Sequence, residues 1–174
     1  MKIIKYLLRF LGIVVLFMSL SFGVTAILAT FSDGPIQVFA GGPLEQGELV
    51  TGPEPNWRFV RDIATIEFQL LNPARSRTVW IIENEGRIYL ISGYMNSLVG
   101  RIWKQWPAQA MEDGRAIIRI DGKRYARQLV RIERGPILGA IAAEAARKYG
   151  VPMTREYIEE GNGWVFALVP RPAS

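Results

Sequence analysis

Residues 75–93 read RSRTVWIIENEGRIYLISG, and this stretch decides the fold. β-Branched and aromatic residues fill both arms, and the polar link Asn84-Glu85-Gly86 between them is typical of a hairpin turn. The apolar runs are denser than a strand with one buried face needs, so we expect much of this hairpin to be covered on both sides. The predicted core residues are Val79, Ile81, Ile88 and Leu90.

A second hairpin follows in residues 115–132, RAIIRIDGKRYARQLVRI, where Asp121-Gly122 is a strong turn signal. Thr65–Leu70 alternates apolar and polar residues like a half-buried strand, and Trp164–Val169 is the predicted closing strand. Consecutive hairpins without a β-α-β rhythm favour a mainly β fold with helices, of the α+β class. We therefore predict an antiparallel sheet that curls into a barrel.

Two helices are predicted in this domain. The first is capped by Ser97, and we expect Pro107 to break or kink it. Its apolar positions are Val99, Ile102, Trp103 and Trp106. The second runs from Pro136 to Gly150, with an i,i+4 pair of Glu144 and Lys148. Its predicted buried stripe is Ile137, Leu138, Ile141 and Ala145.

The N-terminus carries a long apolar run, Leu11–Phe31, which is the length that a helix needs to cross a bilayer. Three basic residues (Lys2, Lys5 and Arg9) precede it, and Asp33 follows it. We predict that residues 1–32 form a signal-anchor transmembrane helix in a bacterial inner membrane. By the positive-inside rule, the C-terminal domain is then expected on the periplasmic side. A cleaved signal peptide is the competing interpretation, with a mature N-terminus near Ile27.

Glycine and proline punctuate residues 33–56, which we interpret as a linker or as a strap over the domain. Only Ile36–Phe39 resembles a short strand there. The barrel domain is predicted to span residues 57–174.

Composition excludes several kinds of chemistry. The chain has no cysteine and no histidine, so thiolate catalysis, disulfides and metal sites built on these two residues are excluded. No carboxylate cluster has a metal-like spacing either, so no metal site is predicted. Without the three basic residues before the apolar run, 18 basic side chains face 16 acidic ones. That balance argues against nucleic acid as a partner.

The order of elements resembles the split β-barrel superfamily, which includes pyridoxamine-phosphate-oxidase-like flavoproteins and deazaflavin-dependent nitroreductases. The similarity covers residues 57–148 and rests on a basic strand entry, an apolar hairpin, a Trp-Pro helix and a second hairpin through Ile120–Tyr125. The resemblance implies a homodimer that binds FMN or a deazaflavin in a groove between the barrel and its partner. The entry Asn72-Pro73-Ala74 and the Pro107-Ala108 sequence depart from the deazaflavin enzymes' pattern.

The candidate cofactor-binding residues lie at two places. The strand entry Arg75–Thr78 offers two guanidinium groups and two hydroxyls that can grip a phosphate or a carboxylate, or can simply be a solvated strand entrance. Lys104 and Trp106 can neutralise a charge and stack on a ring, although core packing explains the tryptophan equally well. The predicted site residues are Arg75, Ser76, Arg77, Thr78, Lys104 and Trp106. Tyr94 and Ser92 are candidates for the mouth of the groove.

Two functions remain open at this point. The first is a membrane-anchored, exported flavin- or deazaflavin-binding protein, an oxidoreductase if it is an enzyme. The second is a non-catalytic envelope module that binds a protein partner or anionic lipid. The arginines of residues 115–132 serve the lipid interpretation, or they pair with acidic residues elsewhere in the chain.

Overall fold

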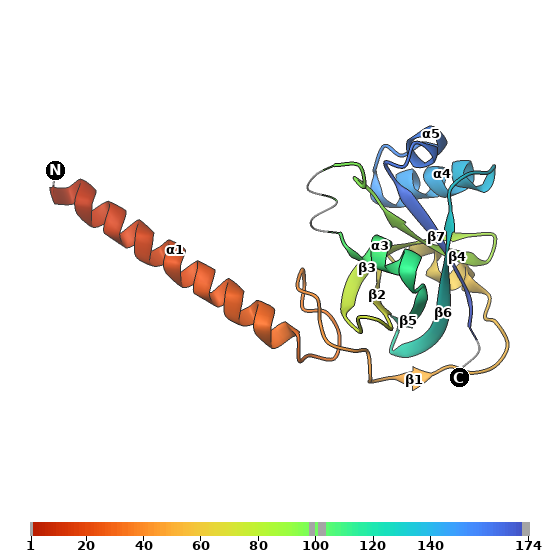
Figure 1. Cartoon of the computed structure of the whole chain (residues 1–174), viewed down its shortest axis with the longest axis horizontal. Helices are drawn as coiled ribbons and strands as arrows, with labels where there is room; N and C mark the ends of the chain where they lie inside the picture. The colour runs from red at the N-terminus through yellow and green to blue at the C-terminus, as the bar shows by residue number, and fades with distance from the viewer. Residues whose placement is uncertain (1, 98–99, 101–103, 172–174) are drawn as a thin grey trace.

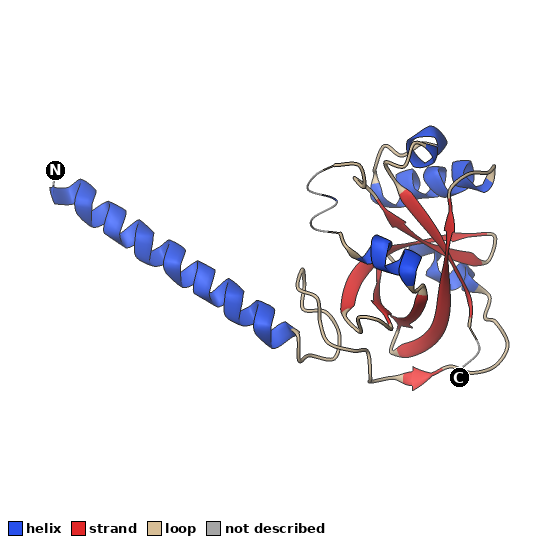
Figure 2. Cartoon of the chain, viewed as in Figure 1, coloured by secondary structure: helices blue, strands red, loops and turns tan. Residues whose placement is uncertain are grey.

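The computed structural model describes residues 2–97, 100 and 104–171. Its centre is a closed barrel of six antiparallel strands (Figures 1 and 2). The order around the barrel is β6-β5-β2-β3-β4-β7, and β7 pairs again with β6. The prediction of an α+β fold with an antiparallel barrel is thus confirmed. The strands are β2 (Thr65–Leu70), β3 (Ser76–Asn84), β4 (Arg87–Ser92), β5 (Arg115–Ile120), β6 (Lys123–Ile132) and β7 (Trp164–Pro170).

Strand β6 closes the barrel because it serves two neighbours. Its first part, Lys123–Gln128, pairs with β5, and its last part, Arg127–Ile132, pairs with β7. A two-residue strand, β1 (Glu48–Leu49), adds to β6 in parallel.

Both hairpins have two-residue turns with positive φ at each turn position. The values are 52° and 78° for Glu85 and Gly86, and 48° and 74° for Asp121 and Gly122. This is the type I′ geometry that matches the twist of the flanking strands. The first turn is tighter than the sequence indicated, because Asn84 still pairs with Arg87 inside the sheet.

Alternating side chains of the barrel build two cores. Inward-facing residues fill the interior together with two tryptophans, Trp57 and Trp106. Outward-facing residues such as Ile82 and Tyr89 pack under helix α4 (Ile137–Tyr149). The first hairpin is therefore covered on both sides, as its apolar density predicted, and Val79, Ile81, Ile88 and Leu90 are all buried in the interior.

Three short helical elements complete the domain. The 3₁₀ helix η1 (Trp57–Asp62) and helix α3 (Trp106–Glu112) carry the two interior tryptophans, and α5 (Arg155–Glu159) packs beside α4. Helix α4 ends at Gly150, whose φ of 65° is the left-handed C-cap that the sequence predicted.

Helix α1 (Lys2–Ala29) extends away from the barrel (Figure 1). It is long and apolar enough to cross a membrane, and its most apolar window has no buried residue. Its last residue, Ala29, is in contrast fully buried.

The structure differs from two local predictions, and a third prediction concerns residues that it does not describe. Pro107 is the second residue of α3 and lies in its first turn, where its missing N–H costs nothing. The predicted positions Val99, Ile102 and Trp103 lie outside the described residues. Ile36–Phe39 is a tight turn closed by two backbone hydrogen bonds between these two residues, not a strand within a sheet.

The predicted pair of Glu144 and Lys148 does not form. Glu144 accepts hydrogen bonds from Arg147, while Lys148 Nζ donates to the backbone oxygens of Ile81 and Val60 at 2.8 and 3.2 Å. Lys148 therefore ties α4 to β3 and η1.

Candidate functional site

A pocket of about 320 Å³ opens beside the start of β3 and the end of β4. One wall comes from these two strands, and the facing wall comes from Val151–Met153 and Tyr157, which lie between α4 and β7. Its volume is at the lower end of the range for small-molecule sites. The described lining is mainly apolar and aromatic, with a few polar groups.

Three of the predicted site residues meet in this pocket. Thr78 comes from β3, Lys104 from the segment before α3, and Trp106 from the first turn of α3. Tyr94 and Ser92, the candidates for a groove mouth, line the same pocket.

Lys104 is the only cation among the described lining residues. Its Nζ donates to the backbone oxygen of Gly93 at 3.2 Å and lies 5.5 Å from the centre of the Tyr94 ring. Burial lowers the pKa of Lys104 below its ordinary value. A negatively charged group placed beside the amine of Lys104 would compensate for the hydration that the amine loses on burial.

Aromatic rings stand at the mouth and at the base. Tyr94 and Trp80 are 68% and 42% exposed, while Trp106 is buried against Phe68 and Phe166. Trp80 stacks on Tyr149 at 4.4 Å between ring centres. The arrangement presents aromatic surface to a flat occupant, and Trp106 also packs in the core as its alternative role predicted.

The remaining predicted residues do not line the pocket. Arg75 donates to the backbone oxygen of Ala40 at 2.9 Å, and Ser76 is fully buried, with no partner for its hydroxyl among the described residues. Arg77 lies opposite Phe68 in the sheet, and burial together with Arg75 lowers its pKa to about 10. The described residues thus do not assemble Arg75–Thr78 into a single anion clamp.

The arginines of the second hairpin are largely paired within the chain. Arg115 contacts Asp113, Arg127 contacts Glu54 and Arg131 contacts Glu133, at 2.8, 2.7 and 3.1 Å. Arg124 donates to the backbone oxygens of Gly47 and Leu44. This geometry matches the internal pairing for Arg115, Arg127 and Arg131, whereas Arg124 keeps its charge because its partners are neutral backbone oxygens.

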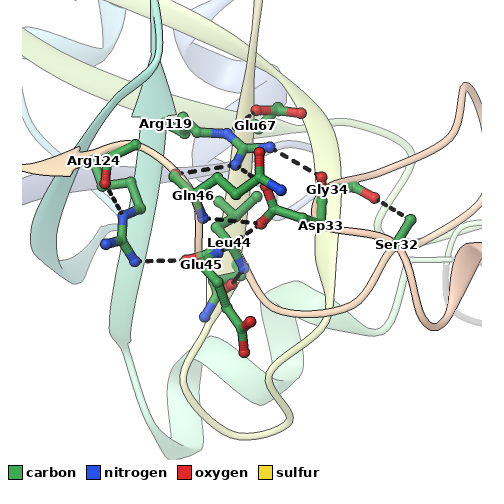
Figure 3. Close-up of polar contacts among 11 residues, drawn as sticks. Ser32, Asp33, Gly34, Leu44, Glu45, Gln46, Glu67, Arg119 and Arg124 are labelled. Carbon is green, nitrogen blue, oxygen red and sulfur yellow. Dashed lines mark hydrogen bonds and ion pairs between the residues drawn. The ribbon is translucent and has the colours of Figure 1, made fainter.

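Arg119 makes the densest set of polar contacts, at the junction of helix and barrel (Figure 3). Its guanidinium pairs with Asp33 at 2.6 Å and with Glu67, which lies directly across the sheet. It also donates to the backbone oxygens of Asp33 and Gln46, both at 3.2 Å. We call Asp33, Glu67 and Arg119 the junction cluster.

Asp33 completes the cluster on the helix side. Its other carboxylate oxygen accepts from the backbone N–H groups of Glu45 and Gln46 at 2.6 and 3.3 Å. Burial alone would raise the pKa of Asp33, but the hydrogen bonds from Glu45, Arg119 and Gln46 outweigh it and hold the pKa below its usual value.

Comparisons with known proteins give little further information. No protein-family model and no curated protein sequence matches the chain. Among solved structures, the conserved hypothetical protein Rv2991 from Mycobacterium tuberculosis is similar at a TM-score of 0.49. The identity is 15%, and the match covers 74% of this chain and 86% of that chain.

Sequence reasoning missed several residues that now stand out. Trp80, Val151–Met153 and Tyr157 line the pocket. The sequence predicted Trp80 only as part of a strand, and the other residues belong to no recognisable motif. The junction cluster was equally hidden, because its members are 34 and 52 residues apart and meet only once β5 lies beside β2. The alternating pattern of Thr65–Leu70 places Glu67 in a strand, but it does not identify Arg119 as its partner.

Proposed function

We propose that this protein is a membrane-anchored barrel that binds a small, flat ligand carrying an acidic group. The observation that carries the proposal is the meeting of Thr78, Lys104 and Trp106 in one pocket whose mouth holds two exposed aromatic rings. Aromatic rings supply stacking surface, and the half-buried amine supplies one compensating charge.

A flavin or deazaflavin belongs to this class of ligand, and the resemblance to split barrels makes it the first to test. The pocket suits a ring and one negative charge. It offers no described arginine for a phosphate, since Arg75 is held by Ala40 and Arg77 lies off the lining. FMN would therefore depend on groups beyond this lining, such as those of a second protomer in the homodimer that the resemblance implies. If a redox step occurs, the cofactor supplies it and the protein binds and orients the ring.

The decisive experiment is a titration of the full-length protein in detergent. We expect the fluorescence of FMN and of a deazaflavin to be quenched saturably, and riboflavin reports the ring without its phosphate. Lys104→Met should weaken the acidic ligands at least about 10-fold, which corresponds to about 1.4 kcal/mol, and should spare riboflavin.

Lys123→Met is the matched control, because Lys123 is exposed at the β5–β6 turn, away from the pocket lining. Equal loss in both variants would contradict a specific role for Lys104. If none of the three ligands binds saturably, the alternative of a non-catalytic envelope module takes precedence, with a protein or anionic lipid as the partner.

We further propose that the barrel lies outside the cytoplasm, on the periplasmic side of a bacterial inner membrane. Basic residues precede the apolar helix and Asp33 follows it, which is the usual orientation signal. Since the chain has no cysteine, Thr51→Cys introduces a unique label site in an exposed loop. A membrane-impermeant maleimide should label it in intact spheroplasts, and labelling only after lysis would contradict this orientation. A mature N-terminus near Ile27 would contradict the anchor itself.

A further inference from the structure

The loop from Gly34 to Gly41 leaves the barrel as a narrow hairpin, which we call the junction hairpin. Ile36 and Phe39 are joined by two backbone hydrogen bonds of 3.1 and 2.9 Å, so the tip is a two-residue turn. At the neck, a side chain on Gly41 would place its Cβ only 1.9 Å from the backbone oxygen of Gly34. The neck thus requires glycine, and it holds the two arms together.

The junction hairpin lies against helix α1 and not against the barrel surface alone (Figure 1). The rings of Phe39 and Phe22 meet edge to face, with 4.6 Å between their centres. A groove of about 470 Å³ lies between the two elements, beside this contact. It is lined by Phe17, Met18, Ser21, Phe22 and Thr25 of the helix and by Ile36, Gln37 and Phe39 of the hairpin.

The contact with Phe22 gives the depth of the junction hairpin. Phe22 precedes the helix end at Ala29 by seven residues, which is roughly 10 Å along the helix axis. A hydrocarbon core about 30 Å thick occupies about 20 residues of such a helix. The hairpin tip therefore lies level with the part of α1 that would cross the outer leaflet.

The side chains at the tip are suited to that depth. Val38 is 71% exposed and Ile36 is 38% exposed. Both side chains therefore present apolar surface to their surroundings. The one polar tip residue, Gln37, lines the groove together with Ser21 and Thr25.

We propose that the junction hairpin inserts into the outer leaflet beside helix α1 and that lipid acyl chains cover Ile36, Val38 and the groove. This inference rests on the proposed membrane position of α1 and adds a second membrane contact to it. Lipid is the fitting occupant because acyl chains surround any helix that spans a bilayer, and the groove is continuous with that helix surface.

The junction hairpin also cannot swing independently of the barrel. Gly41 exchanges backbone hydrogen bonds with Ser76 at the start of β3, at 2.9 and 3.2 Å. Arg75 holds Ala40, and the junction cluster fixes Asp33 just before the neck. Insertion of the hairpin would therefore set the height of the barrel above the bilayer.

Spin labels in liposomes test the proposal with the full chain. Single cysteines are introduced by Val38→Cys at the tip, Leu16→Cys in the middle of α1 and Thr51→Cys in an exposed loop of the domain. Oxygen concentrates in the bilayer, and a nickel chelate stays in water. We expect labels at residues 38 and 16 to collide more with oxygen and the label at residue 51 to collide more with nickel.

A label at residue 38 that behaves like that at residue 51, while residue 16 remains in lipid, would overturn the hairpin insertion alone. Water exposure at residue 16 would overturn the proposed anchoring and the insertion with it. Dipolar broadening between labels at residue 38 would show a second copy on this surface in place of lipid, and this too would contradict the proposal.

Discussion

Arg119 has little freedom in this structure, because its guanidinium contacts two carboxylates and two backbone oxygens at once. Its side chain is 11% exposed, and Asp33 and Glu67 are 19% and 34% exposed. Charges removed this far from water need partners. Arg119 therefore links Asp33, which follows the apolar helix, to the sheet through charged contacts.

Replacement of Arg119 by methionine should cost about 2 kcal/mol of unfolding free energy, less than the 3–5 kcal/mol of a fully buried pair because Glu67 is partly solvated. The loss arises because two carboxylates are left without their cation. Urea unfolding in a mild detergent measures it. Arg115→Met is the matched control on the same strand, since Arg115 pairs with Asp113 at the surface, and its unfolding should be nearly unchanged. Equal effects would contradict the role given to Arg119.

Asp33 should make the stability depend on acid. Its pKa is depressed in the folded state, so its contribution is present above the ordinary value of 3.8 and is lost as the pH falls through the lower folded pKa. The temperature of half-unfolding of the native chain should therefore decrease as the pH is lowered from about 5 to about 2. Asp33→Asn should show a smaller fall over this range, and an unchanged profile would count against the cluster.

Single residues were the hardest feature to predict from the sequence. Lys104, Trp106 and Thr78 were identified by chemistry, and the fold brings them together. Arg75 was predicted on the same grounds, but its guanidinium donates a hydrogen bond to the backbone oxygen of Ala40. Local sequence shows which groups can bind a ligand, whereas their availability depends on contacts between distant segments.

The strands and turns followed closely from the sequence at the scale of elements. Glu85-Gly86 and Asp121-Gly122 both occupy turns with positive φ, where glycine is favoured at the second position. Pro107 was misjudged because proline ends a helix from within but suits its first turn, and the choice depended on where α3 begins. Helix α5 has only five residues, too few for a periodic pattern.

Gly41→Ala tests the neck of the junction hairpin. The new methyl group would meet the backbone oxygen of Gly34, so we expect a loss of roughly 1–3 kcal/mol in urea unfolding, as for other overpacked sites. Gly139→Ala is the control, because no neighbour lies within 4 Å and alanine favours a helix by about 1 kcal/mol. If Gly41→Ala is as stable as the native chain, the close neck is not required.

Residues outside the six strands also pack against the barrel. Leu44 is 2% exposed, its N–H donates to Gln69, and β1 pairs with β6. A fragment of residues 57–174 lacks all of these contacts, whereas one of residues 33–174 keeps them. We expect the shorter fragment to be less stable by at least about 3 kcal/mol, given the usual cost of a buried leucine alone. Similar urea midpoints for the two would show that residues 33–56 only connect.

Overall topology was accessible from the sequence because adjacent hairpins leave few ways to arrange antiparallel strands. The closure of β6 on β7 was less accessible, since it joins the second hairpin to a strand that follows two helices. The course of residues 33–56 was left open between a linker and a strap for the same reason: its contacts are with β2, β3, β5 and β6, which follow later in the chain.

The junction cluster would also affect how two protein molecules meet in the membrane. A domain on a flexible tether tumbles, and each productive meeting must first find the right orientation. A barrel fixed to a helix that stands in a membrane would instead turn only about the membrane normal, so every copy would present the same side to its neighbours. Since lost rotational freedom is a main cost of association, a weak contact between membrane-held partners would then suffice for pairing.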